Sequence, residues 1–203
     1  QSGPMTMGAS QVCGFIKSDP SRATPNLQFH VQPISTDILG ATKMHDFDGI
    51  TPTIANVRPS SRGEINIASK DSRDNPKIKM NYLSTQDDRD IAAKALKIVR
   101  NIMLNTKTFK KYETEEYRPG AHITGDEELV KAASDHAQTI FHPVGTCKMG
   151  NDENSVVSDE LKVHGIENLR VIDASIMPNI TSGNTNAPTI MIAEKGADMI
   201  LNN

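Results

Sequence analysis

The chain has 203 residues, of which 36% are hydrophobic, and carries a formal net charge of −3 at pH 7. This length allows one large domain, or one domain together with part of another. The acidic balance argues against a nucleic-acid-binding surface, which is usually basic, and no run of about 18 apolar residues could span a bilayer. The first ten residues lack the basic and apolar blocks of a secretion signal. We therefore expect a cytoplasmic protein.

The cysteine content and the first residue give two further expectations. Cys13 and Cys147 are the two cysteines of the chain, far apart in sequence. They are too few for a disulfide scaffold and match no cysteine-based zinc motif, so we expect two buried thiols in a reducing compartment. The chain begins with glutamine and enters a strand-like run soon after a Gly-Pro turn. We expect it to be a piece of a longer polypeptide.

The first part of the chain contains two strand-like runs, at 11–17 and 26–32. In the second run every other residue from Leu27 to Val31 is apolar and the residues between are polar. This alternation is typical of a strand with one buried face and one face toward water. His45 follows in an irregular stretch and is expected to be a solvated loop residue.

A three-strand pattern occupies 51–57, 63–68 and 77–83. The short connections favour antiparallel neighbours, and the alternation in the last two runs predicts a sheet with a wet face and a dry face. Ser84 then opens a helix in which apolar residues recur at helical spacing as far as Met103, so one stripe should be buried. The Arg and Lys residues of this helix lie opposite and are expected to be solvated.

The remaining elements are another helix, a loop, a short strand and a final helix. Thr124 and Glu127 form a capping box at the start of the second helix. The loop is followed by an apolar strand at 169–174 and a helix at 190–200. Strands followed by helices indicate an α+β fold, with an antiparallel β-sheet backed by helices on one face.

His142 is the first candidate for a functional residue. It lies in FHPVGTCKMG (141–150), where Pro143 and Gly145 disfavour helix and sheet. An unperturbed imidazole titrates near pH ~6.5 and can accept a proton at neutral pH. A single histidine is more often a surface residue or a hydrogen-bonded core residue, so both interpretations stay open here.

The start of the last helix is a second candidate. Asn184 and Asn186 precede it, and Pro188 fits the first turn, where its missing N–H costs nothing. The free N–H groups of a helix start can hold an electron-rich oxygen or a developing anion; the alternative is that Asn184 only caps the helix or shapes a turn. Asp173, at the end of the predicted strand, could bind a ligand or only cap the turn at Ser175.

A metal site is a third possibility. His136, His142 and Cys147 are spaced by six and then five residues, which matches no common zinc pattern. Lys148, next to Cys147, would repel a cation. We expect no metal.

Several motifs carry a resemblance to a known family. They are HPVGTCKMG (142–150), LKVHGI (161–166), LRVIDASIMP (169–178) and TSGNTNAPT (181–189), with RPSSRG (58–63) and NYL (81–83) earlier in the chain. Together they resemble the C-terminal region of the glucose–methanol–choline (GMC) flavoprotein oxidoreductases, in particular choline dehydrogenase-like and related alcohol dehydrogenases. The Gly-rich G-x-G-x-x-G turn that holds FAD in the family does not occur in this sequence.

The resemblance implies a division of the chain by role. Residues 1–150 would belong to the substrate-binding domain, and residues 151–203 would be a strand–helix segment that contributes to the FAD-binding domain. The rest of that domain would be the missing N-terminal part of the same polypeptide. We therefore expect the isolated chain to be inactive and able to associate with itself through surfaces left uncovered.

The resemblance also implies roles for single residues. His142 matches the catalytic histidine beside the flavin N5, and Asn184 matches the second active-site position. Contacts with FAD are implied for Asp173, Ala174, Asn186, Ala187, Pro188 and Thr189. The implied reaction is oxidation of a small primary alcohol, in which His142 takes the hydroxyl proton and a hydride passes to flavin N5. The resemblance leaves the electron acceptor open between oxygen, a quinone and a carrier protein. An acceptor located in a membrane would bring the enzyme to that membrane. The alternative is a non-catalytic module that binds a small ligand in the same pocket.

Overall fold

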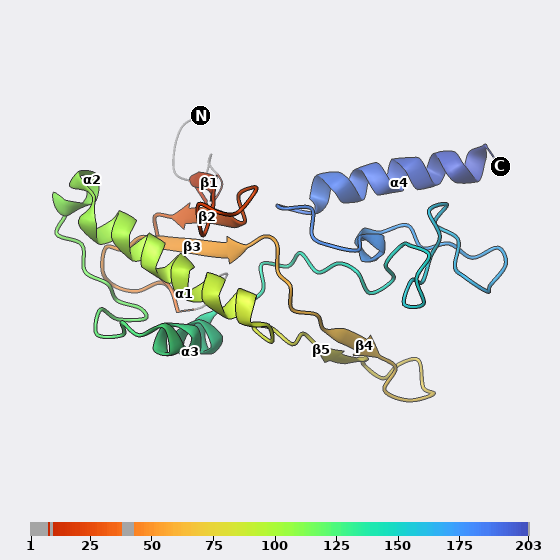
Figure 1. Ribbon diagram of the computed structural model, residues 1–203, viewed down its shortest axis with the longest axis horizontal. Coiled ribbons are helices and arrows are strands. Elements are labelled where there is room, and N and C mark those ends of the chain that lie inside the picture. The colour runs from red at the N-terminus through yellow and green to blue at the C-terminus, as the bar shows by residue number, and fades with distance from the viewer. Residues whose placement is uncertain (1–7, 9, 38–42, 203) are drawn as a thin grey trace. The chain divides into compact units, whose positions relative to one another are not determined.

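The computed structural model describes residues 8, 10–37 and 43–202 (Figure 1). The chain forms two compact units: the first contains residues 1–56 and 86–137, and the second contains residues 57–85 and 138–203. The predicted division into a substrate-binding part (1–150) and a part of the FAD-binding domain (151–203) concerns a longer protein and stays a prediction. The boundaries of the two compact units differ from it. Within the described ranges, no helix is long and apolar enough to cross a membrane.

An antiparallel three-stranded sheet forms the centre of the first unit. Its strands are β1 (Val12–Ile16), β2 (Leu27–Gln32) and β3 (Thr51–Asn56), in the order β1-β2-β3. Leu27 pairs with Ile16 on one side and with Asn56 on the other, so β2 is the central strand. The strands predicted at 11–17, 26–32 and 51–57 are therefore confirmed, and so is their antiparallel pairing.

The predicted wet face of β2 is wrong. Gln28 and Gln32 are only 1% and 4% exposed, whereas Val31 is half-buried. The reason is that a central strand is flanked by neighbours that cover and bind its polar side chains. The Gln32 amide donates to the hydroxyl of Ser10 at 3.0 Å and its carbonyl accepts from the hydroxyl of Thr53 at 3.3 Å.

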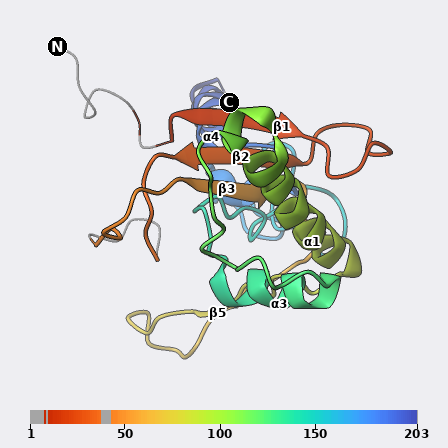
Figure 2. The ribbon, with the colours of Figure 1, turned by 90° about the vertical axis from the view of Figure 1, so that its left-hand side faces the viewer.

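Helices complete the first unit. They are α1 (Gln86–Arg100), a π-helical segment η2 (Asn101–Asn105), α2 (Lys107–Lys110) and α3 (Asp126–His136). Figure 2 shows α1 lying across one face of the sheet. Ile91 and Ala95 of α1 pack with Leu27 in a buried cluster, which confirms the predicted apolar stripe.

The charged face of α1 is less solvated than predicted. Lys94 pairs with Asp19 at 2.9 Å, and Arg100 has a side chain that is only 20% exposed. The Arg100 guanidinium donates to both carboxylate oxygens of Glu116, at 2.6 and 2.8 Å, and to the carbonyl of Ile123 at 3.0 Å. The hydrogen bond with Glu116 raises the pKa of Arg100. Arg100 therefore connects the end of α1 with the segment before α3 through these hydrogen bonds.

Three smaller predictions are also wrong. The second helix begins one residue later than expected. Its cap is formed by Gly125 and Glu128, and not by Thr124 and Glu127: the N–H of Gly125 donates to the Glu128 carboxylate at 3.2 Å. His45 is not solvated: its side chain is 17% exposed and stacks on Phe47 with ring centroids 4.9 Å apart. Cys13 is exposed because β1 is an edge strand, and Cys147 is only partly buried.

The second unit begins with a two-stranded antiparallel ribbon. β4 (Glu64–Asn66) pairs with β5 (Lys77–Lys79), placing Ile65 opposite Ile78. All six residues of the two strands are exposed in the described chain. The antiparallel pairing is confirmed, but the predicted dry face is wrong, because the third run, 51–57, joins the other sheet and leaves this ribbon with two strands.

Gly63, just before β4, offers a test of this ribbon. A Cβ atom at Gly63 would lie 2.2 Å from the carbonyl oxygen of Lys79 and 2.7 Å from that of Met80. Backbone cannot yield as a flexible side chain can, so Gly63→Ala is expected to lower the free energy of unfolding by about 1–3 kcal/mol and to speed amide exchange in β4 and β5. Gly14→Ala is the matched control, because a Cβ there meets nothing within 4 Å. Equal unfolding midpoints for the two variants would contradict this prediction.

The core of the second unit is formed by irregular backbone and one long helix. Val157, Leu161, Ile176, Met177 and Ile192 make the buried cluster. Isolated bridges join Met149 with Val157, Val157 with Val163, and Lys162 with Arg170. A short 3-10 helix, η3 (Ala174–Ile176), precedes α4 (Asn186–Leu201). The predicted final helix and the place of Pro188 in its first turn are confirmed.

The predicted strand at 169–174 is wrong. Arg170 makes a single bridge, and the chain then turns into η3. The reason is local: the Asp173 carboxylate accepts a hydrogen bond from the N–H of Ser175 at 2.7 Å and so caps a helical turn where a strand would continue.

Candidate active site

The loop that carries His142 is held against η3. The N–H of Cys147 donates to the carbonyl of Ser175 at 3.1 Å, and the N–H of Met149 donates to the carbonyl of Ile176 at 2.8 Å. Gly145 has a φ of +89°, and a Cβ there would lie 3.3 Å from the carbonyl oxygen of Met177. The close approach of two backbone segments therefore requires a glycine, and the predicted loop is confirmed.

The start of α4 supplies the second wall of the site. Thr185 is the residue before the helix and is only 7% exposed. Its carbonyl accepts hydrogen bonds from the N–H of Thr189 at 3.0 Å and from the hydroxyl of Thr189 at 2.7 Å. These bonds hold the Thr185 backbone in place, while Asn184, one residue earlier, has an exposed side chain.

The structure brings the imidazole of His142 between these two residues. Its Nδ1 lies 2.8 Å from the Thr185 hydroxyl oxygen and 3.4 Å from the Thr185 backbone nitrogen. Its Nε2 lies 2.8 Å from the Asn184 amide nitrogen. His142 is half-buried, so one edge of the ring is anchored and the other faces an exposed amide. The convergence expected for His142 and Asn184 is therefore present within one unit.

Thr185 is the site residue that sequence reasoning missed. It stands between Asn184 and Asn186 in the motif SGNTNAPT. A hydroxyl residue just before a helix is normally assigned to capping. The signal for another role was Pro188, because proline lacks one of the N–H groups from which a capping hydroxyl would accept a hydrogen bond.

The other predicted residues lie in two places near this pair. Asp173 and Ala174 are at the start of η3, the element whose carbonyls hold the His142 loop. The Asp173 carboxylate caps the turn at Ser175, as the local alternative predicted. The remaining four residues are in the first turn of α4: Asn186, Ala187, Pro188 and Thr189. Asn186 and Ala187 are exposed there.

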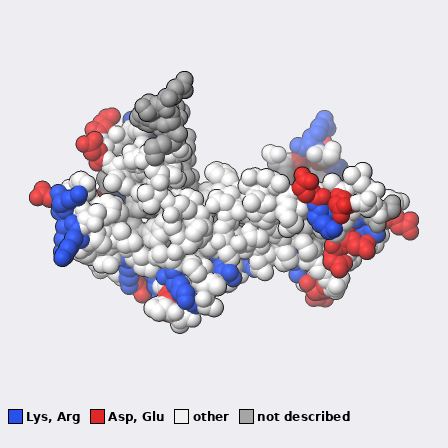
Figure 3. Space-filling view, turned by 90° about the horizontal axis from the view of Figure 1, so that it is seen from above, with Lys and Arg blue, Asp and Glu red and all other residues white. Residues whose placement is uncertain are grey.

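The charges around the loop are paired. Lys148 donates to both carboxylate oxygens of Asp152 at 2.9 Å, and this hydrogen bond holds the pKa of Asp152 below its ordinary value. Lys162 pairs with Glu160 at 2.6 Å. Figure 3 shows basic and acidic side chains side by side over the loops and helix of this unit. The charged side chains of these loops therefore largely neutralise one another.

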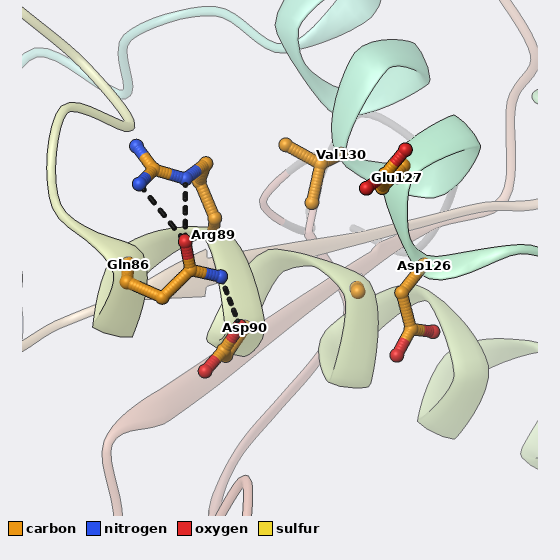
Figure 4. A pocket seen from close by; sticks show the side chains of 7 residues that line it. Gln86, Arg89, Asp90, Asp126, Glu127 and Val130 are labelled. Atoms are coloured by element: carbon orange, nitrogen blue, oxygen red, sulfur yellow. Dashed lines mark hydrogen bonds between the residues drawn. The ribbon is translucent and has the colours of Figure 1, made fainter.

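A cavity of about 320 Å³ lies in the first unit, between α1 and α3. Its lining residues are Gln86, Arg89, Asp90, Ala93, Asp126, Glu127 and Val130. Figure 4 shows the Gln86 amide bonded to Arg89 and Asp90, so these polar groups already satisfy one another. None of the predicted site residues lines this cavity. In the part of the chain that the structure describes, no group of three or more His, Cys, Asp or Glu side chains is placed to hold a metal ion.

Comparison with known proteins agrees with the fold. The chain is 47% identical over 187 residues to the oxygen-dependent choline dehydrogenase of Proteus mirabilis, covering 92% of this chain and 33% of the relative. It is 44% identical over 199 residues to the alcohol dehydrogenase [acceptor] of Pseudomonas putida, covering 98% and 36%. The chain thus spans about one third of the length of these relatives.

Solved structures give the same picture. Pyridoxine 4-oxidase from Mesorbium loti superposes with a TM-score of 0.80 at 26% identity, over 94% of this chain and 38% of that one. A variant of formate oxidase from Aspergillus oryzae, described for its FAD modification, superposes with a TM-score of 0.79 at 28% identity, over 88% and 32%. The family model for the C-terminal part of GMC oxidoreductases matches residues 59–193, more than half of the chain. The chain therefore belongs to the GMC oxidoreductase family.

Proposed function

We propose that this chain is the C-terminal part of an FAD-dependent oxidoreductase that converts a primary alcohol into an aldehyde. In this proposal His142 accepts the hydroxyl proton and Asn184 holds the substrate oxygen. The observation that carries the proposal is the placement of the His142 ring: Thr185 anchors Nδ1, and Nε2 faces the Asn184 amide at 2.8 Å. A base and a hydrogen-bond donor thus face each other directly.

The chemistry of an alcohol explains why these two groups belong together. Hydrogen leaves a carbinol carbon as hydride more readily once the hydroxyl proton has begun to leave, because negative charge on oxygen pushes the electron pair out. A hydroxyl placed between the two side chains would accept the N–H of Asn184 and give its proton to Nε2 of His142. The Asn184 side chain is exposed, so it can move aside to admit the oxygen.

Several residues of this unit fit a flavin. The N–H groups at the first turn of a helix have no partner within the helix and carry partial positive charge, and Asn186 and Ala187 present such groups on an exposed surface. Asp173 and Ala174, beside the His142 loop, are the other residues that would contact it. Bound FAD would supply the hydride acceptor, taking the carbinol hydrogen with its electron pair while the alcohol becomes the aldehyde.

The surface of α4 supports a further part of the same polypeptide as the partner. Ile192 and Gly196 are buried, yet Ile190, Met191, Ile200 and Leu201 are 55%, 59%, 54% and 81% exposed. A helix that is apolar on several sides is usually buried on several sides. An N-terminal FAD-binding part would cover this surface, which agrees with the relatives being about three times as long. Without that part, we expect the isolated chain to be inactive.

The proposal is tested with the full-length polypeptide that contains this chain. The purified protein is expected to carry FAD, and adding choline or another primary alcohol without oxygen should bleach its visible absorption and produce the aldehyde. The 203-residue chain mixed with FAD should do neither. Tight binding of a small alcohol by the full-length protein, with no flavin and no aldehyde, would instead indicate a non-catalytic binding module.

Asn184→Ala gives a more specific test. The variant loses the N–H that would stabilise the developing negative charge on the substrate oxygen, so kcat is expected to fall by ~10²-fold. Steady-state kinetics of aldehyde formation measure this. Asn154→Ala, the same change in an exposed loop of the unit, should keep wild-type kinetics. A wild-type kcat for Asn184→Ala would show that this amide does not hold the reacting oxygen.

A further inference from the structure

The geometry points to Thr185 as a positioning residue that sets the tautomer of His142. We infer that the Thr185 hydroxyl accepts the Nδ1–H of His142, which leaves the lone pair of the neutral ring on Nε2, on the side of Asn184. The inference deepens the proposed function and rests on it for its catalytic meaning, because a base can act only if its lone pair faces the proton it removes.

Two groups of Thr185 lie near Nδ1, and they constrain the tautomer differently. The backbone N–H can only donate, so it would need an unprotonated Nδ1 and a proton on Nε2. The hydroxyl can donate or accept, so its contact with Nδ1 fits either tautomer. The hydroxyl is 2.8 Å away and the backbone nitrogen 3.4 Å. Since hydrogen bonds in proteins usually span 2.7–3.2 Å, the hydroxyl makes the stronger contact, and the backbone N–H does not fix the tautomer.

The other edge of the ring decides between the two tautomers. The Asn184 atom nearest to Nε2 is its amide nitrogen, at 2.8 Å. An amide nitrogen donates and does not accept, so Nε2 must offer its lone pair there. A neutral ring with a lone pair on Nε2 carries its proton on Nδ1, and Thr185 is the residue placed to receive that proton.

The start of α4 explains why this hydroxyl is available. A threonine before a helix normally accepts an N–H from the second or third helical residue. Here the third helical residue is Pro188, which has no N–H, and the Thr185 side chain makes no capping bond. Burial to 7% exposure and the two bonds to its carbonyl keep the residue in place, and a β-branched side chain has restricted χ1. The hydroxyl therefore stays directed at His142.

The tautomer can be measured directly in the full-length protein with ¹⁵N-labelled histidine. Two-bond ¹⁵N–¹H correlation spectra distinguish a protonated Nδ1 from a protonated Nε2, and the spectrum of His142→Gln identifies the His142 signals by their loss. We expect Nδ1–H in the wild type. Thr185→Val keeps the shape but removes the acceptor, so the proton should move to Nε2, and Thr185→Ser should restore Nδ1–H.

The kinetic expectation follows from the tautomer. Thr185→Val should lower kcat by roughly tenfold or more, in line with the loss of one hydrogen bond, with little change in KM because in this inference Thr185 acts through His142. Thr185→Ser should recover most of the loss, and Thr181→Val, the same change at an exposed position, should behave as wild type in both measurements. A purely structural role would lower thermal stability without moving the proton.

The two proposals fail in different ways. Nδ1–H retained in Thr185→Val, or Nε2–H in the wild type, would overturn the role of Thr185, even if His142→Gln were inactive. Wild-type turnover in His142→Gln would overturn the proposed function, whatever the spectra of the Thr185 variants show. A folded Thr185→Ser variant with the tautomer of Thr185→Val would also overturn the inference, because serine keeps the hydroxyl.

Discussion

Replacing His142 with glutamine is expected to lower kcat/KM for alcohol oxidation by ~10²–10⁴-fold, the usual contribution of a positioned base. Glutamine can still bond to Thr185 and Asn184, but it cannot accept a proton at neutral pH. The loss should therefore appear mainly in kcat. Anaerobic rates of alcohol-dependent flavin reduction in the full-length protein measure this step apart from reoxidation.

His136→Gln is the matched control for this variant. His136 is exposed at the end of α3, and the same substitution there should leave the rate of flavin reduction unchanged. The bound FAD content of His142→Gln should equal that of the wild type, because His142 is assigned to the alcohol and not to the binding of the flavin. A His142→Gln variant with full FAD content and an unchanged rate would refute the assignment of the base.

The second large effect concerns stability. Leu27→Ala is expected to lower the free energy of unfolding by ~2–5 kcal/mol, because it removes a buried side chain and leaves a cavity. Leu27 is 0% exposed in the central strand β2 and packs with Ile91 and Ala95 of α1. The change therefore removes a central part of the contact between the sheet and α1. Urea unfolding of the 203-residue chain, followed by circular dichroism, measures it.

The chain offers the same substitution at an exposed leucine as a control. Leu201, near the end of α4, is 81% exposed, so Leu201→Ala should change the free energy of unfolding by no more than about 0.5 kcal/mol. If Leu27→Ala cost less than 1 kcal/mol, or if the two variants unfolded at the same urea concentration, the buried cluster would not hold the first unit together.

Sequence patterns predicted the structure correctly where residues close in sequence decide it. The alternation in 26–32 predicted a strand, and the helical spacing of Ile91 and Ala95 predicted the buried stripe of α1. Turn-forming residues predicted the His142 loop, because proline and a glycine with positive φ limit the backbone wherever they stand. The pairing of His142 with Asn184 came from the resemblance to the GMC family, since no local pattern joins residues 42 positions apart.

Two failures of sequence reasoning, at β2 and at the ribbon of β4 and β5, share one physical cause: a neighbour distant in sequence changed the outcome. Gln28 and Gln32 are buried because β2 received a strand on each side, and alternation within a strand carries no information about its neighbours. The ribbon of β4 and β5 has no dry face because β3 pairs with β2. Pairing partners are a property of the folded chain.

The amino-acid sequence by itself determined the family, the main strands and helices, and the histidine and asparagine of the candidate site. Only the tertiary structure decided which atom of Thr185 meets His142 and which ring nitrogen faces Asn184. The reason is that a hydrogen bond depends on distances of a few tenths of an ångström between groups that folding brings together. Residue types and their spacing along the chain do not contain those distances.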